Sequence, residues 1–430
     1  MSDALTLAIA GLGTVGVGTL QLLETHRDLL QARCGRSLQV VAVSARDKNR
    51  DRGVKLDGFD WYDDPVEMAR ESKADVVLEL IGGSDGPARE TCEVALDGGK
   101  HVVTANKALV ALHGGDLARR AESAGVALSY EAAVAGGIPI IKALREGLAA
   151  NGVSSLHGIL NGTCNYILTT MRETGRPFED VLSEAQSLGY AEADPSFDID
   201  GVDAAHKLAI LTSVAFGCEV NFDGVHIEGI RHVAAEDIAY ATELGYRIKL
   251  LGLTDRTESG VLQRVYPAMV PLDAPIAGVE GVFNGVVAEG DFVGPTMYEG
   301  RGAGAGPTAS AVVADVVDIA CGRNTATFGV PVDLLSKTPS LSLNERVGLY
   351  YVRLMVEDST GVFADIATTL RDAGISIESA MQRTRSDSGV VPVVLTTHET
   401  REAEMSAALE SLAKLKSVAE TPRMIRIESL

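Results

Sequence analysis

A glycine-rich turn near the N-terminus constrains the fold of this chain more than any other feature. It follows a short apolar run, Thr6–Ala10, and opens a helical stretch over Val17–Thr25. In its G-x-G-x-x-G spacing the first glycine permits a tight turn, the second lets the backbone approach a pyrophosphate, and the third lets helix and strand pack closely. The helix N-terminus then directs amide groups at the anion. The loop predicts a dinucleotide-binding domain, and the candidate cofactor contacts are Gly11, Leu12, Gly13, Thr14, Val15 and Gly16.

The segment around this loop alternates short apolar runs with longer helical patterns. The predicted strands are Thr6–Ala10, Leu38–Val43, Asp75–Leu80, His101–Thr104 and Ala127–Tyr130. Strands that alternate with helices imply right-handed crossovers and a parallel sheet with helices on both faces. We therefore predict an α/β fold whose residues 1–135 form a doubly wound, Rossmann-type domain.

Two further domains are expected after residue 135. Residues 136–335 combine long apolar helices with alternating runs typical of antiparallel strands, which predicts an α+β domain for substrate binding, catalysis and subunit association. We expect the chain to return to the first domain near residues 300–325. Residues 346–430 follow a β-α-β-β-α-β order, which is typical of the ferredoxin-like split β-α-β fold. The predicted elements are Leu349–Val356, Gly361–Ala373, Ile375–Arg383, Val390–Thr397, Arg401–Leu415 and Val418–Ile427.

The charge balance excludes some classes of partner. The chain of 430 residues carries a formal net charge of −21, which argues against nucleic-acid and anionic-membrane surfaces, because both need clustered Lys and Arg. No apolar run reaches the roughly 18 residues that a membrane span needs. The five cysteines are widely spaced and suit neither a disulfide framework nor a zinc ribbon. We therefore expect a cytoplasmic protein whose anionic ligands bind at local positive sites.

The end of the second predicted strand bears on the choice of cofactor. Arg46 and Lys48 flank Asp47 there. An acidic residue at this point binds the ribose diol of NAD, whereas an arginine accepts the 2′-phosphate of NADP. The local balance is basic, so NADP is favoured and NAD remains possible.

A charged pair stands out within a mostly apolar helical stretch, Asp203–Phe216. Asp203 and Lys207 are four residues apart and therefore project from one helix face. Burying such a pair costs desolvation energy that is often tolerated at a functional site, and burial moves a lysine pKa toward the range useful for proton transfer. The alternative is a helix-surface ion pair of about 0.3–0.5 kcal/mol.

Six blocks of the sequence resemble the signature segments of homoserine dehydrogenases. They are Val103–Leu109, Tyr130–Pro139, Leu160–Leu168, Gly189–Pro195, Asp203–Leu208 and Gly302–Ser310. The C-terminal unit resembles an ACT domain, a small ligand-sensing module. This resemblance implies an NAD(P)-dependent oxidoreductase that reduces L-aspartate 4-semialdehyde to L-homoserine in the biosynthesis of threonine, methionine and isoleucine.

The resemblance also implies roles for individual residues. Lys207 matches the proton donor, with Lys107 as a rival that also contacts cofactor and substrate. Asp203 and Glu192 match residues that hold the substrate. The remaining implied contacts are Gly189 for substrate and cofactor, and Thr104 and Gly304 for the cofactor.

A monovalent cation, with sodium as the expected ion, is implied by the resemblance alone. Its ligands would be the carboxylate of Glu131 and the main-chain carbonyls of Val134, Gly136 and Ile138. Hard oxygen ligands without Cys or His fit such an ion better than zinc. The residues by themselves indicate only a strand, a glycine turn and a helix that starts near Pro139.

The ACT resemblance suggests that L-threonine acts as a feedback effector, binding near the turn Glu357–Gly361. Open sheet edges favour a homodimer or homotetramer. Two alternatives stay open at this point. One is a non-catalytic sensor of dinucleotides and amino acids, and the other is a different amino-acid semialdehyde dehydrogenase.

Overall fold

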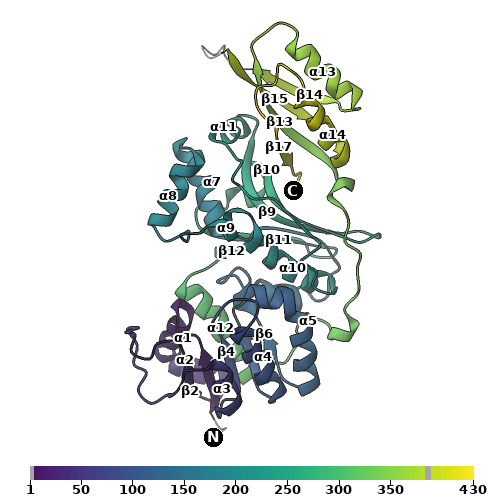
Figure 1. Ribbon diagram of the computed structural model, residues 1–430. Coiled ribbons are helices and arrows are strands. Elements are labelled where there is room, and N and C mark those ends of the chain that lie inside the picture. The colour runs from purple at the N-terminus through teal and green to yellow at the C-terminus, as the bar shows by residue number, and fades with distance from the viewer. Residues whose placement is uncertain (1–3, 383–388) are drawn as a thin grey trace.

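The computed structural model describes residues 4–382 and 389–430. The chain forms three stacked regions, with the N-terminal sheet at one end and the C-terminal unit at the other (Figure 1). Within the described residues, no helix is long and apolar enough to cross a lipid bilayer.

The first region is a six-stranded parallel sheet in the order β3-β2-β1-β4-β5-β6. This order is that of a dinucleotide-binding Rossmann sheet, so the predicted fold class is confirmed. β3 was not predicted, because its three residues carry too short a pattern. The elements are β1 (Leu5–Ala10), α1 (Thr14–Thr25), α2 (Arg27–Cys34), β2 (Leu38–Ser44), β3 (Asp60–Tyr62), α3 (Pro65–Glu71), β4 (Val76–Glu79), α4 (Pro87–Asp97), β5 (His101–Thr104), α5 (Lys107–Ala124) and β6 (Leu128–Ser129).

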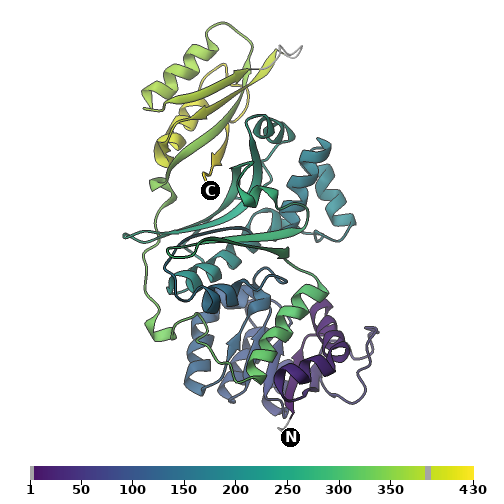
Figure 2. The same cartoon turned by 180° about the vertical axis from the view of Figure 1, so that it is seen from behind.

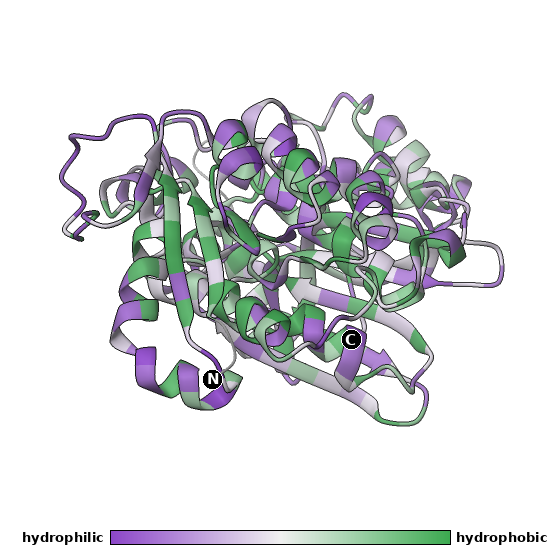
Figure 3. Ribbon diagram, turned by 90° about the horizontal axis from the view of Figure 1, so that it is seen from below, coloured by the Kyte–Doolittle hydropathy of each residue, from purple (hydrophilic) through white to green (hydrophobic). Residues whose placement is uncertain are grey.

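Apolar residues cover both faces of this sheet. One face packs against α3, α4 and α5, and the other against α1 and against α12 (Ala305–Ala320), which returns from far along the chain. Figure 2 shows α12 in green beside the purple N-terminal helices. In Figure 3 the strands near the N-terminus are largely green and apolar, whereas the surrounding helices alternate green and purple. A strand buried on both faces accounts for the continuous apolar runs in the sequence.

The middle region is built on antiparallel strands, as predicted, and helices α7 and α10 pack on them. Strands β7 and β12 were not predicted. The elements are η1 (Glu131–Ala133), α6 (Ile140–Lys142), η2 (Ala143–Gly147), β7 (Val153–Ile159), α7 (Gly162–Thr174), α8 (Phe178–Ser187), α9 (Ser196–Ile199), α10 (Val202–Phe216), β8 (Val225–Ile227), α11 (Ala235–Glu243), β9 (Tyr246–Arg256), β10 (Val261–Pro271), η3 (Pro275–Gly278), β11 (Phe283–Gly290) and β12 (Gly294–Arg301).

The C-terminal unit shows the predicted β-α-β-β-α-β order. Its first predicted strand is longer and its last shorter than expected, and Arg383, the predicted end of another, lies outside the described residues. The elements of the unit are β13 (Val347–Glu357), α13 (Val362–Asp372), β14 (Ile377–Gln382), β15 (Val390–Thr397), β16 (Thr400–Arg401), α14 (Glu402–Leu412) and β17 (Arg423–Ile427), and the segment before it holds η4 (Val332–Leu334) and η5 (Leu343–Glu345).

The middle and C-terminal sheets are joined into one. β17 pairs in parallel with β10 through Ala268 with Arg426 and Met269 with Ile427, giving the order β12-β11-β7-β9-β10-β17-β13-β15-β14. The C-terminal unit is therefore bonded to the strands that support the middle region.

Candidate active site

The glycine-rich loop has the shape that a dinucleotide needs. Gly11 adopts φ +99°, and a Cβ there would lie 2.5 Å from the carbonyl oxygen of Leu80. A Cβ on Gly16 would lie 2.0 Å from the carbonyl oxygen of Gly11, whereas nothing lies within 4 Å of the Cβ position of Gly13. The outer glycines allow close packing, and the central one leaves the backbone open to a ligand. The loop therefore fits a pyrophosphate group.

A cavity of about 580 Å3 lies between this loop and the middle region, a size typical of small-molecule sites. It gathers many of the predicted site residues from separate segments. The loop side contributes Val15, Ala105, Gly136 and Gly304, and the middle region contributes Asn161, Gly189, Glu192, Asp198, Asp203 and Lys207, with Lys107 between them.

Asp203 is the centre of the polar network in this cavity. Its side chain is buried in the first turn of α10, and Oδ2 accepts hydrogen bonds from Lys207 Nζ at 2.7 Å and from Asn161 Nδ2 at 2.8 Å. Oδ1 pairs with Lys107 Nζ at 3.0 Å. One carboxylate thus bridges two lysines that are a hundred residues apart in the sequence.

The two lysines keep this carboxylate ionised. Burial alone would raise the pKa of Asp203, but Lys207 and Lys107 outweigh it and hold that pKa well below its usual range. Burial lowers the pKa of Lys107, and the attraction of Asp203, with smaller contributions from neighbouring carboxylates, reverses this and raises it. The ammonium of Lys107 therefore stays protonated beside the cavity.

Lys207 retains one donor for a ligand. Its ammonium donates to the carbonyl oxygen of Leu160 at 2.7 Å and to Asp203. An ammonium carries three N–H donors, so the third is available for an oxygen atom in the cavity. Hydrogen-bonded on two sides, Lys207 is held at one position.

The short helix α9 completes the polar side of the cavity. Asp198 accepts from Asn161 Nδ2 at 2.8 Å, and Lys107 Nζ lies 5.5 Å from the ring centre of Phe197. The pKa of Asp198 is raised by its burial and by the neighbouring charge of Asp203. Asn161 caps α7, since its side chain accepts from the amide of Cys164. Asn161, Asp198 and Phe197 were not predicted as site residues, although an Asn before a helical run was a readable cap signal.

Comparison with known proteins decides which family has this arrangement. Residues 139–317 match the model described as homoserine dehydrogenase, residues 11–131 match its NAD-binding domain, and residues 350–417 match the ACT domain. A homoserine dehydrogenase of Pseudomonas aeruginosa is 47% identical over 99% of both chains. The chain belongs to the homoserine dehydrogenase family.

Solved structures of homoserine dehydrogenases agree with this assignment. One from Thiobacillus denitrificans superposes with a TM-score of 0.93 at 46% identity, covering 99% of this chain and 98% of that one. A hyperthermophilic archaeal homoserine dehydrogenase in complex with NADPH gives a TM-score of 0.62 at 28% identity, covering 73% of this chain and 97% of that one. The chain is thus an oxidoreductase that acts on a CH–OH group and interconverts L-homoserine and L-aspartate 4-semialdehyde.

Some predicted cofactor contacts lie outside the cavity. Thr104 is buried and its hydroxyl donates to Glu79 Oε2 at 2.6 Å, so its side chain does not face the ligand space. Arg46 and Lys48 are exposed on the loop after β2. Arg52, which was not predicted, links that loop to the glycine turn by donating to the carbonyls of Leu12 at 3.3 Å and Asp47 at 2.6 Å.

The loop predicted to hold a cation is rich in oxygen atoms. Ala135 has φ +53° and is the only described residue other than glycine in the left-handed region, which marks local strain. Within residues 4–382 and 389–430, the carbonyls of Val134 and Gly136 accept no hydrogen bond, whereas that of Ile138 accepts from the Ile140 amide at 2.8 Å. These open carbonyls suit a hard monovalent cation.

Glu131, the predicted carboxylate ligand, lies near the start of this loop. It is 2% exposed and accepts from the amides of Ile141 and Lys142, both at 2.9 Å. Burial, with a contribution from Asp315, raises the pKa of Glu131 to about 7. A bound cation would favour the ionised carboxylate, so the residues present fit the group.

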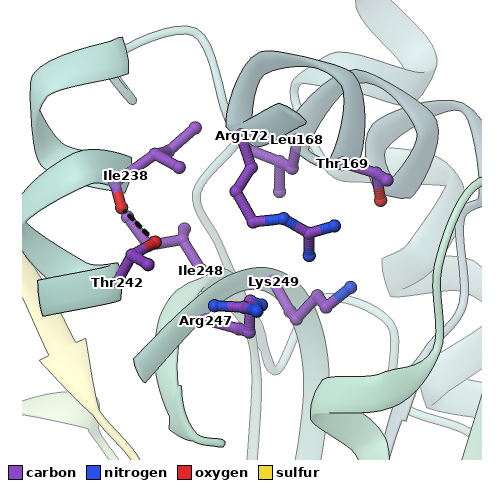
Figure 4. A pocket seen from close by; sticks show the side chains of 8 residues that line it. All are labelled: Leu168, Thr169, Arg172, Ile238, Thr242, Arg247, Ile248 and Lys249. Carbon is purple, nitrogen blue, oxygen red and sulfur yellow. Dashed lines mark hydrogen bonds between the residues drawn. The ribbon is translucent and has the colours of Figure 1, made fainter. Parts of the chain in front are cut away.

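A second, much smaller cavity of about 10 Å3 lies between α7, α11 and β9 (Figure 4). Burial lowers the pKa of Lys249 in its wall to about 8 against the opposing charge of Glu280. The ammonium is held by Asn165 Oδ1 at 3.1 Å and the Val279 carbonyl at 2.5 Å. The space suits about one water molecule and is too small for an amino-acid substrate.

Proposed function

We propose that Lys207 delivers the proton when this enzyme reduces L-aspartate 4-semialdehyde, and that Asp203 and Lys107 hold it in place. The observation that carries this is the free third donor of Lys207, which lies in the substrate cavity while its other two donors are bonded. Negative charge develops on the aldehyde oxygen during reduction, and a fixed ammonium stabilises that charge before donating its proton.

The remaining roles follow from charge. Glu192 and Asp198 lie on the same cavity as Lys207, and a carboxylate pair suits the α-ammonium of an amino-acid substrate. Lys107, one third exposed, retains donors for the substrate or the cofactor. The nicotinamide, when bound, supplies the hydride to the aldehyde carbon.

Kinetics of two variants test these roles. Lys207→Met should lower kcat for homoserine oxidation about a hundredfold or more, measured by nicotinamide absorbance. Glu192→Gln should mainly raise KM for homoserine, because it removes a binding contact and leaves the proton donor. If Lys107→Met abolished turnover while Lys207→Met kept more than a tenth of it, Lys107 would be the proton donor and Lys207 would have the positioning role.

For the cofactor, we propose a preference for NADP. Arg46, Lys48 and Arg52 place positive charge on the loop after β2, and the archaeal relative in complex with NADPH supports the same choice. The double change Arg46→Ala and Lys48→Ala should raise KM for NADP about tenfold and leave KM for NAD nearly unchanged. An equal effect on both cofactors would contradict the preference.

For the cation, we propose sodium bound by Glu131 and the carbonyls of Val134, Gly136 and Ile138. The open carbonyls and the buried carboxylate support this assignment. Activity in sodium-free buffer should rise on addition of sodium with a saturable dependence, and Glu131→Gln should remove that dependence. A response equal to that produced by a bulky organic cation would show only an ionic-strength effect.

For regulation and assembly, we propose L-threonine inhibition through the C-terminal unit and a homodimer or homotetramer, in threonine, methionine and isoleucine biosynthesis. The exposed edge strands β12 and β14 support subunit pairing. Turnover of the full chain measured at increasing threonine concentration tests the inhibition. Size-exclusion chromatography with light scattering gives the molar mass and so tests the assembly. We also propose domains at residues 1–135, 136–335 and 346–430, to be tested by limited proteolysis.

A further inference from the structure

A cavity of about 350 Å3 lies where the C-terminal unit meets the middle region. One wall comes from the segment after β8 and from α11, and the other comes from β17 and the residue before it. Its lining includes Glu228, His232, Asp237, Pro267, Arg423 and Met424. The cavity has charged groups of both signs and apolar walls, and it is separate from the substrate cavity.

The two carboxylates in this cavity differ in how many of their hydrogen-bond acceptor positions are already occupied. Asp237 is 1% exposed and is saturated by Arg353, which donates at 2.6 and 3.0 Å, and by Tyr351, which donates at 2.9 Å. Glu228 has a side chain 41% exposed, and its Oε1 is bonded both to Arg426 at 2.9 Å and to His226 Nε2 at 2.7 Å. Its Oε2 accepts one hydrogen bond, from Arg426 at 2.8 Å. A carboxylate oxygen can accept two hydrogen bonds, so Oε2 of Glu228 can also accept from a ligand.

The two basic groups, by contrast, are unpaired. Neither Arg423 nor His232 makes a side-chain hydrogen bond or ion pair with any residue that the structure describes. A guanidinium that lines a cavity without a carboxylate partner is a ready site for an anion, because it binds carboxylates in a bidentate way. The cavity thus offers a cationic end and an anionic end.

We propose that this joint cavity binds a small L-α-amino acid, whose carboxylate contacts Arg423 and His232 and whose ammonium contacts Glu228. The apolar lining of Pro267, Met424 and Val233 receives the side chain. The volume of about 350 Å3 suits a molecule of this size. As an effector site, this proposal rests on the proposed regulation by an amino acid and places the ligand at the joint, not at the turn Glu357–Gly361.

Residues in the wall of the joint cavity contact α9, and α9 also contributes Asp198 to the wall of the substrate cavity. Gly229, in its wall, packs so tightly on α9 that a Cβ there would lie 2.2 Å from the Ile199 carbonyl oxygen. The Ile230 amide donates to the same carbonyl at 2.8 Å, and Arg231 bonds to Asp200 and, at 2.9 Å, to Ser196. A ligand that draws Glu228 toward it therefore pulls on the helix that carries Asp198 and Phe197.

Occupation of the joint cavity is expected to lower activity. In the present arrangement α9 places Asp198 against Asn161 and Phe197 beside Lys107. Displacement of α9 disturbs both contacts, so the ligand should reduce turnover and raise KM for homoserine. Arg231 acts as a positioning residue in this connection.

Binding to the full-length enzyme tests the site. Each protein L-amino acid is titrated by calorimetry, and the best binder is compared with its methyl ester and its N-acetyl form, each of which should bind about tenfold more weakly because one charge is lost. Arg423→Ala should weaken binding of the unmodified amino acid by about tenfold or more, while Arg371→Ala, an exposed arginine on α13, should leave it unchanged.

Three results would overturn the proposal. They are an absence of binding by any amino acid, undiminished affinity in Arg423→Ala, and an affinity for the ester or the N-acetyl form as high as that for the unmodified amino acid. Arg231→Ala should keep the affinity and reduce the inhibition, and unchanged inhibition there would refute the connection through α9. Turnover of homoserine without effector is measured on every variant. A failure of the proposed catalytic function is then distinguished from a failure of amino-acid binding at the joint cavity.

Discussion

Replacement of Asp203 by asparagine removes the charge that holds the two lysines in the substrate cavity. At the 3.0 Å separation of Asp203 Oδ1 and Lys107 Nζ, two unit charges attract by about 5 kcal/mol at an effective dielectric constant of about 20. One third of the Lys107 side chain is exposed, and screening by water reduces this to about 2–3 kcal/mol. Loss of this attraction removes the main force that keeps the Lys107 ammonium protonated.

The sign of the pH effect follows from this attraction. Asp203 raises the pKa of Lys107, so its loss lets the ammonium deprotonate at lower pH. Aldehyde reduction needs both Lys107 and Lys207 in the protonated form. The rate of reduction therefore falls when the pH rises far enough to deprotonate them. In Asp203→Asn the alkaline limb of kcat/KM should move to lower pH, and kcat/KM at neutral pH should fall about a hundredfold.

The assay is aldehyde reduction followed by nicotinamide absorbance from acid to alkaline pH. Asp198→Asn is the matched control, because this carboxylate also raises the pKa of Lys107 but contributes less than Asp203, so its alkaline limb should move less. Thermal melting establishes that both variants are folded. An unmoved alkaline limb in folded Asp203→Asn would refute the electrostatic reasoning.

Three further outcomes follow from individual contacts. Gly16→Ala should unfold at lower temperature, because its Cβ would lie 2.0 Å from a carbonyl oxygen, whereas Gly13→Ala should melt normally and bind cofactor about tenfold more weakly in a fluorescence titration. Folding raises the pKa of Glu131 to about 7, so its stabilising contribution is complete below pH about 4.5 and is lost as pH rises to about 7. In urea titrations carried out in sodium-free buffer, Glu131→Gln should remove that pH dependence. A pH dependence unchanged in Glu131→Gln would show that another group causes it. Arg353→Met leaves Asp237 buried without its bidentate partner. It should lower the free energy of unfolding by about 3–5 kcal/mol. A decrease of less than about 1 kcal/mol would contradict this prediction.

Local patterns in the sequence were enough to predict the two outer folds. The order of strands and helices up to residue 135 gives a parallel sheet because each helix returns the chain to the end of the sheet where the previous strand began, and His101–Thr104 was predicted with the observed bounds. Val390–Thr397 was likewise predicted as observed. The helix over Asp203–Phe216 differs from α10 by one residue. These segments carry strong periodic signals that tertiary contacts do not override.

Contacts between distant segments could not be read from such patterns. The four-residue spacing of Asp203 and Lys207 was visible, but the pairing of Asp203 with Lys107 depends on where β5 ends relative to α10. Thr104 is predicted to contact the cofactor, and the hydrogen bond from its hydroxyl to Glu79 depends on the pairing of β4 with β5, which no local pattern shows. The role of Phe197 depends on α9, a four-residue helix whose sequence has no periodic signal.

The joint between the C-terminal unit and the middle region was equally invisible, since the paired strands β10 and β17 lie far apart in the chain. This joint changes how the C-terminal unit has to be understood. Arg426 pairs at once with Glu228 of the middle region and Glu402 of its own unit, and Glu428 accepts from Tyr266 of β10 at 2.6 Å.

Buried charges of this kind stabilise a fold only while every partner is present. Removing the C-terminal unit would expose the edge of β10. Glu228 would lose Arg426, Asp237 would lose Arg353 and Tyr351, and Tyr266 would lose Glu428. We therefore expect that a chain cut before this unit loses stability as well as regulation. Regulation through this joint needs no long-range relay, because the segment after β8 contacts Arg426 with one residue and α9 with the next.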